Sequence, residues 1–268
     1  MSDILLNMLP LIGAGLVAGF LAGLLGIGGG IVTIPALFIV LGKVGVPHEW
    51  RMHVAIATSL TIIIATNSSS VWAHNRKGGV AWSVVKDWWW AVALGAFAGS
   101  FFAKGLKTAE LVYFFATLAG FVALKMLLPF DRWKLGDELP SGPFRYLNPG
   151  LIGFFSAVMG IGGGSFSVPY MTLYNVPIHR AVGTSALMGL VISVTAGLGY
   201  LIGGYGIAGM PAGMAGFIHL PSALVVAAAA VIMAPLGAKV AHKLPKKALS
   251  TTFGIFLVIA TIRLLSDV

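Results

Sequence analysis

Two glycine-rich runs, GIGGGIVTIP at residues 26–35 and GIGGGSFSVP at residues 160–169, lie in an otherwise apolar chain. Consecutive glycines weaken a helix, since each costs about 1 kcal/mol relative to alanine. Behind the runs, Thr33 and Ser167 each stand two residues before an aligned proline, a pattern typical of a helix N-cap. We therefore expect each run to break one helix and start another. The free N–H groups and positive dipole end of the new helix suit an anion.

Hydroxyl side chains could supply further donors to the same anion. The Thr-Ser pairs at residues 58–59 and 184–185 align with each other in apolar surroundings, and Ser165 stands where the first run has Ile31. Such hydroxyls can also bond to the i−4 carbonyl or join helices. The predicted substrate-binding residues are Gly28, Gly29, Gly30, Thr33, Thr58, Ser59, Gly162, Gly163, Gly164, Ser165, Ser167, Thr184 and Ser185.

Two histidines, His53 and His179, begin the aligned helices that carry the Thr-Ser pairs. Histidine titrates near neutral pH, so either side chain could couple proton movement to transport. The alternative is a plain interfacial position beside Arg51 or Arg180.

Other polar groups inside the apolar segments are few and neutral. Residues 67–70, Asn-Ser-Ser-Ser, form a polar run opposite Ser193 and Thr195; it could line a pathway or join helices. All 8 Asp and Glu residues lie in loops or near segment ends. Carboxylate proton relays and metal cages are therefore poorly supported. The sequence predicts no metal site, no cofactor and no enzymatic activity.

The composition is that of a polytopic membrane protein. Of 268 residues, 58% are hydrophobic and 9% are charged, whereas a soluble domain carries about 25% charged residues. The net charge of +9 resides mainly in loops, where it meets lipid headgroups rather than nucleic acid. We expect an all-α protein in the bilayer. The absence of cysteine excludes disulfides and thiol chemistry.

The chain divides into two similar halves. Three motifs recur in the same order, including HVAIATS at residues 53–59 and HRAVGTS at residues 179–185. A Pro-, Gly- and charge-rich stretch at residues 129–147 separates them. We therefore predict a first transmembrane repeat at 1–128, a linker at 129–147 and a second transmembrane repeat at 148–268.

Two topologies fit the halves. In one, each glycine-interrupted element is a re-entrant hairpin followed by three transmembrane helices, which makes the repeats inverted. This arrangement puts most of the 17 Lys and Arg residues on one side of the membrane, as the positive-inside rule favours. It gives a cytoplasmic linker and two periplasmic termini. In the other, each element is a single broken span and the repeats are parallel; residues 4–27 are long enough to span alone.

The paired GIGGG…P elements, each followed by a His…Thr-Ser helix, resemble the TauE/SafE family of sulfite and organosulfonate exporters over residues 10–266. The resemblance implies a transporter of the bacterial inner membrane that moves anions such as sulfite or sulfoacetate, usually outward.

These features together predict a secondary transporter whose substrate sits near the midplane between the two GIGGG elements and moves by alternating access. The alternative is a permease or channel for another small anion; a cation or metal permease is less well supported because no acid lies at depth. The sequence leaves open the anion, the coupling ion and the oligomeric state, a homodimer included.

Overall fold

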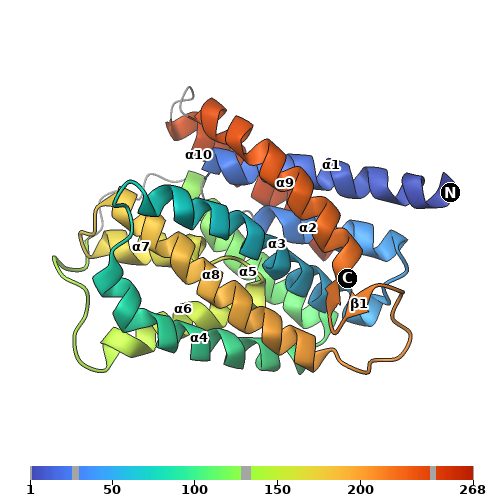
Figure 1. The fold of residues 1–268 in the computed structure, drawn as a ribbon, viewed down its shortest axis with the longest axis horizontal. Helices are drawn as coiled ribbons and strands as arrows, with labels where there is room; N and C mark the ends of the chain where they lie inside the picture. Colours follow the sequence, from blue (N-terminus) through green and yellow to red (C-terminus); the bar gives the residue numbers. More distant parts are fainter. Residues whose placement is uncertain (1, 26–29, 128–133, 242–245, 268) are drawn as a thin grey trace.

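The computed structural model describes residues 2–25, 30–127, 134–241 and 246–267. Within these ranges the chain is mostly helical, with one short hairpin (Figure 1). The elements are α1 (Ser2–Leu25), α2 (Gly30–Lys43), the 3-10 turn η1 (His48–Trp50), α3 (Arg51–Asn75), α4 (Trp82–Lys104), α5 (Thr108–Leu127), α6 (Phe144–Met159), α7 (Gly164–Leu173), α8 (Ile178–Gly203), β1 (Met214–Ala215), β2 (Ile218–His219), α9 (Leu220–Ala241) and α10 (Lys246–Leu265).

Several helices are suited to a bilayer. In the described ranges, three are long and apolar enough to cross a membrane: His48–Asn75, Ile178–Gly203 and Leu220–Gly237. Shorter apolar helices accompany them, such as Thr108–Leu124 and Gly254–Leu265. A helix suits this environment because it satisfies its backbone hydrogen bonds internally. The chain is therefore a helical, multi-pass membrane protein, as its composition predicts.

The helices pack in crossed pairs between the two halves of the chain. α1 packs along α9, α6 packs along α4, and α3 with α8 and α5 with α10 also pair. In Figure 1 both chain ends are marked towards the right, whereas the 134–143 segment lies at the left. Exchange of partners between equivalent helices is the pattern that a two-fold relation between repeats would produce. Inverted and parallel repeats would both produce it, so the two topologies stay predictions.

Glycines allow the crossed pairs to approach closely. A Cβ on Gly15 of α1 would lie 2.7 Å from the Ala229 Cβ of α9, and one on Gly19 would overlap the backbone of Ala230. On α6, a Cβ on Gly153 would overlap the Val92 carbonyl of α4. Small residues favour helix association in membranes because they let backbones meet. These contacts fix the outer helices against α3 and α8.

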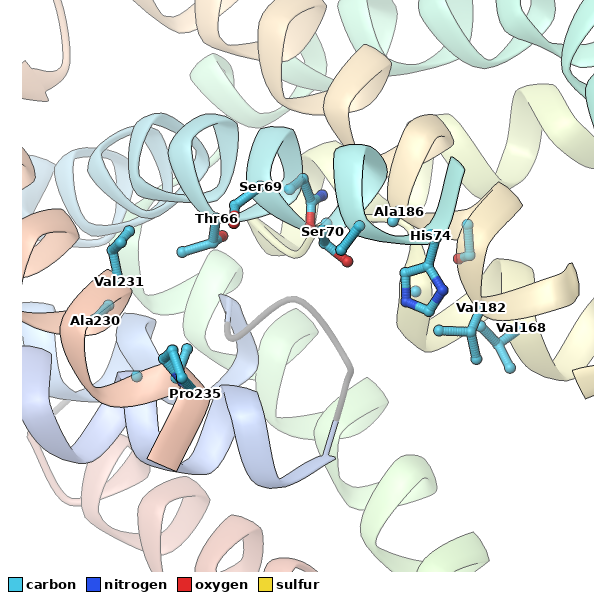
Figure 2. Close-up of a pocket in the computed structure, with 17 residues that line it drawn as sticks. Thr66, Ser69, Ser70, His74, Val168, Val182, Ala186, Ala230, Val231 and Pro235 are labelled. Carbon is cyan, nitrogen blue, oxygen red and sulfur yellow. The ribbon is translucent and has the colours of Figure 1, made fainter. Parts of the chain in front are cut away.

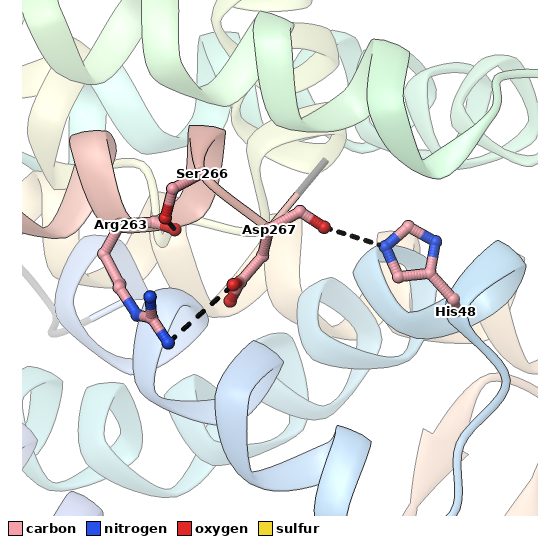
Figure 3. A network of polar contacts seen from close by, with 4 residues as sticks. All are labelled: His48, Arg263, Ser266 and Asp267. Atoms are coloured by element: carbon pink, nitrogen blue, oxygen red, sulfur yellow. Dashed lines mark hydrogen bonds and ion pairs between the residues drawn. The ribbon is translucent and has the colours of Figure 1, made fainter.

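The two halves also meet near the end of α10. The His48 Nε2 atom of η1 lies 3.0 Å from the Asp267 carbonyl oxygen, to which the ring donates, and Arg263 forms an ion pair with Asp267 at 3.8 Å (Figure 3). Both ion-pair groups are partly exposed, so this contact contributes little to stability. The hydrogen bond from His48 joins the end of the last helix to the first half.

Candidate functional site

The second glycine run is a helix break, as predicted. α6 ends at Gly160, whose φ of 66° is left-handed, a conformation that glycine adopts without Cβ strain. The Ile161 N–H then donates to the Ser156 carbonyl at 3.0 Å, and α7 begins at Gly164. In the described part of the chain, the backbone N–H groups of Gly162 and Gly163 donate to no acceptor.

The expected N-caps are wrong, because each new helix starts earlier. α2 begins at Gly30 and α7 at Gly164, so Thr33 and Ser167 lie inside the first turn instead of before it. Gly163 precedes α7 without a side-chain cap. Thr33 Oγ1 donates back to the Gly30 carbonyl at 3.1 Å. Glycine backbone freedom thus sets the helix start, and the hydroxyls serve elsewhere.

In the first run, Gly28 and Gly29 lie outside the described residues. Gly30 is described, and a Cβ there would stand 2.8 Å from the Gly160 carbonyl oxygen. The end of the first run therefore lies directly against the second break. Because this contact is backbone to backbone, no other residue fits at position 30 without a shift.

Hydroxyls of the first half hold this contact together. The Thr33 Oγ1 and Ser59 Oγ atoms are 2.8 Å apart, and Ser59 donates to the Gly160 carbonyl at 3.2 Å. Both residues are buried. Their hydrogen-bonding capacity is therefore largely used within the protein.

The aligned hydroxyls of the second half are free. The Oγ atoms of Ser165, Ser167 and Ser185 are buried and have no hydrogen-bond partner in the described part of the chain. A buried hydroxyl without a partner costs about 1–3 kcal/mol. Among the described residues, the Ser156 and Ser193 hydroxyls are also buried without a partner, so what distinguishes Ser185 is that it lines the pocket described below.

Thr58 and Thr184 have matching partners. Thr58 Oγ1 accepts from the His219 N–H at 3.1 Å, and Thr184 Oγ1 accepts from the Ala81 N–H at 2.8 Å. His219 directly precedes α9 and Ala81 directly precedes α4. Each threonine thus satisfies a donor at the start of a helix in the opposite half. Their contact with substrate stays a prediction.

A pocket of about 380 Å³ opens beside the second break. One wall is polar: Figure 2 shows Thr66, Ser69, Ser70 and His74 of α3 directed into the cavity. The facing wall is apolar and comes mainly from α9. The lining residues are Gly19, Thr66, Asn67, Ser69, Ser70, Ala73, His74, Gly162, Gly164, Val168, Val182, Ser185, Ala186, Ala230, Val231, Ala234 and Pro235.

The pocket brings together part of the predicted site. It includes Gly162, Gly164 and Ser185, whereas Thr58 and Thr184 are not among its lining residues. The described residues that line it include no Asp, Glu, Lys or Arg. Its donors are therefore neutral hydroxyl, amide and peptide groups, with one histidine.

Sequence reasoning passed over Thr66 and His74. With the run at 67–70 they follow a spacing of three to four residues, which places them on one face of α3. That periodicity was the available signal. It could not reveal which helix would face the polar stripe.

The two predicted histidines lie in different environments, and neither lines the pocket. His53 is buried; its Nε2 lies 3.0 Å from the Ala103 carbonyl, and its ring stacks on Phe217 at 5.1 Å between centroids. His179 is exposed at the start of α8. Proton coupling through either stays a prediction, and His74 is the histidine that lines the pocket.

No group of three or more metal-ligating His, Asp or Glu side chains occurs among the residues that the structure covers. The free N–H group of Gly162 and the unpartnered Ser185 hydroxyl line a cavity that has one apolar wall.

Comparison with known proteins agrees with a transport role. The family described as "Sulfite exporter TauE/SafE" matches residues 11–264. A "Probable membrane transporter protein" of Haemophilus influenzae is 33% identical over 93% of this chain and 95% of its own length. YunE of Bacillus subtilis, also a probable membrane transporter protein, is 26% identical over 75% of this chain and 80% of its own. No solved structure matches significantly. The chain thus belongs to the sulfite exporter TauE/SafE family, and both relatives are named probable membrane transporters, which supports a membrane transporter.

Proposed function

We propose that the protein is a secondary transporter that exports small sulfur-containing anions, such as sulfite or organosulfonates, across the bacterial inner membrane. The pocket at the second glycine break is its substrate site. Family membership supports a transporter, and the chemistry of the pocket supports an anion.

One observation carries the choice of an anion. The Ser185 hydroxyl lines the pocket and is buried without a partner, and Gly162, which also lines it, has a backbone N–H that donates to no acceptor in the described part of the chain. Peptide N–H groups can only donate, so the ligand that satisfies them must accept several hydrogen bonds. A sulfur oxyanion has at least three acceptor oxygens and a negative charge that the N-terminal end of α7 favours.

Neutral donors suit a carrier. An Arg or Lys in the pocket would bind an anion tightly, whereas peptide and hydroxyl groups hold it through hydrogen bonds and a partial helix charge. Binding of moderate strength allows release on the far side. The pocket therefore favours turnover over retention.

The packing supports alternating access by inverted repeats. His74, at one end of the pocket, lies in the last turn of α3, and Lys134 of the linker donates to Asn175 at 3.2 Å just after α7. In the inverted topology this linker is cytoplasmic and both termini are periplasmic. The substrate then loads from the cytoplasmic side, which is the direction that export requires.

Counterflow in proteoliposomes tests the proposal. Vesicles preloaded with unlabelled sulfite or sulfoacetate should accumulate labelled anion transiently, whereas sulfate and thiosulfate serve as comparison substrates. A carrier shows such exchange and a channel does not. Flux without counterflow would replace the carrier by an anion channel.

A matched pair of variants tests the site. Ser185→Ala removes a hydroxyl that lines the pocket, and Ser193→Ala removes an equally buried, unpartnered hydroxyl of α8 outside the pocket lining. We expect about a tenfold loss of apparent affinity for Ser185→Ala, since one hydrogen bond to an anion is worth about 1.5–3 kcal/mol. Ser193→Ala should match the wild type. Equal behaviour of the two variants would remove Ser185 from the site.

A further inference from the structure

The wall of the pocket beside the second break depends on one glycine of α8. Continued alignment of the Thr-Ser helices pairs Ile63 with Gly189. The Ile63 side chain packs against both glycine runs. A Cβ on Gly30 would lie 2.8 Å from the Ile63 Cδ1 atom, and a Cβ on Gly162 would lie 2.7 Å from its Cγ2 atom. Gly189 fills nothing and so leaves room for another side chain.

Asn67 of α3 occupies that room. A Cβ on Gly189 would collide with the Asn67 Nδ2 atom, and a Cβ on Gly162 would lie 3.1 Å from the same nitrogen. The Asn67 amide therefore sits between α8 and the glycine break. No other residue type fits at position 189 with this amide in place, because the crowding begins at Cβ.

The amide is placed for binding and is not used by the protein. Asn67 is 4% exposed and lines the pocket. Its side chain forms no hydrogen bond with the described part of the chain. A primary amide carries two N–H donors, and an amide that faces the pocket can offer them to a ligand.

We propose that the Asn67 amide is a substrate ligand that selects oxyanions with three oxygens, and that Gly189 is the positioning residue that admits it. This inference rests on the proposed function. Three kinds of donor meet here from three segments: the amide of α3, the Ser185 hydroxyl of α8 and the free N–H groups of the break. Sulfite and sulfonate groups offer one oxygen to each. A carboxylate has two oxygens, so at least one of them must accept from two of these donors.

Equilibrium binding to the purified full chain tests the selection. Ethanesulfonate and propionate have the same two-carbon tail but three and two head-group oxygens, so the wild type should bind ethanesulfonate about tenfold more tightly. Asn67→Ala should weaken ethanesulfonate about tenfold and propionate much less, which removes the preference. Asn67→Asp should weaken both further, because its carboxylate repels anions.

Gly189→Ala tests the positioning role, with Gly197→Ala on the same helix as its control. A Cβ on Gly197 meets no heavy atom within 4 Å, so that variant should bind and transport like the wild type. Gly189→Ala should raise KM about tenfold with little change in maximal flux. The double variant Asn67→Ala/Gly189→Ala should bind no worse than Asn67→Ala, since both changes remove the same interaction.

The outcomes separate the inference from the proposal beneath it. Wild-type affinity and wild-type selectivity in Asn67→Ala would overturn the inference while Ser185→Ala still reported an anion site. Failure of the wild type to bind any sulfite or sulfonate would instead refute the proposed function. If Gly189→Ala does not fold, the Asn67 variants decide alone.

Discussion

The same sequence motif has different hydrogen-bonding roles in the two halves of the chain. Beside the first glycine run, the Thr33 and Ser59 hydroxyls bond to each other at 2.8 Å and Ser59 bonds to the second run. Beside the second run, the aligned Ser167 and Ser185 hydroxyls are buried without partners. The hydroxyls beside the first run therefore support the break, and those beside the second have no hydrogen-bond partner within the described part of the chain, which fits the proposed binding role.

The neighbouring side chains differ in the same direction. Ile63 is packed against both runs, whereas its aligned residue Gly189 leaves space for an amide. Ile31 stands where the second half has Ser165, whose hydroxyl is unpartnered. At these aligned positions the first half carries isoleucine, and the second half carries a glycine and a serine. A duplicated chain can thus keep one pattern and place one site.

The largest expected effect comes from closing the second break. Gly160→Ala puts a Cβ at a left-handed φ of 66°, 2.9 Å from both Ile34 Cδ1 and Ile56 Cγ2. Backbone strain of about 1–2 kcal/mol and overpacking of about 1–3 kcal/mol should add. Unfolding in detergent measures the loss. Gly142→Ala, at a φ of 65° with no neighbour within 4 Å, is the control for strain alone; an equal loss there would mean that the break is not tightly packed.

The next largest loss of stability is expected at Thr58 and Thr184, and it should be similar in the two halves. Thr58→Val leaves the His219 N–H without its acceptor, and Thr184→Val does the same to Ala81. An unsatisfied buried donor costs about 1–3 kcal/mol, so each variant should lose that much unfolding free energy. Denaturation of both single variants checks the symmetry. A loss in only one of them would show that the threonines are not equivalent supports.

The hydroxyls of the first helical turns should behave differently. Thr33→Val removes a hydroxyl bonded to Ser59 and Gly30 and should cost about 1 kcal/mol of stability. Ser167→Ala removes a buried hydroxyl that has no partner, so it should lose no stability and can gain up to about 1–3 kcal/mol. Thermal unfolding of the pair measures the contrast. A larger loss for Ser167→Ala would reverse the roles assigned to the two runs.

The smallest effect is expected at the exposed histidine. His179→Gln should stay within about 0.5 kcal/mol of wild-type stability, as surface changes usually do. His53→Gln should lose about 1–3 kcal/mol, because His53 bonds to the Ala103 carbonyl and stacks on Phe217. Comparable losses would mean that the two positions are packed alike.

Much of this architecture could be predicted from local sequence. The lengths of the apolar segments predict a membrane protein, and the consecutive glycines predict the helix break at Gly160–Gly163. Both predictions depend on residues that are close together in the sequence. The prediction that Thr33 and Ser167 are N-caps is wrong, because the backbone freedom of glycine lets both helices start earlier.

The binding wall depends on contacts far apart in sequence. His74 and Thr66 line the pocket because α9 lies opposite them and α8 lies beside them. Whether a hydroxyl stabilises the fold or is available to a ligand depends on the hydrogen-bond partners within about 3 Å. Ser59 donates to the Gly160 carbonyl, whereas Ser185 has no hydrogen-bond partner in the described part of the chain. Alignment shows the two serines as equals, and only packing separates them.

The most direct test of this division compares Ser59→Ala with Ser185→Ala, measuring unfolding free energy and saturable sulfite binding on each protein. The account predicts that Ser59→Ala loses about 1–3 kcal/mol of stability, because its bonds to Thr33 and Gly160 disappear. Ser185→Ala should lose no stability and should bind sulfite about tenfold more weakly. A stable Ser59→Ala together with unchanged sulfite affinity in Ser185→Ala would contradict the claim that one run supports and the other binds.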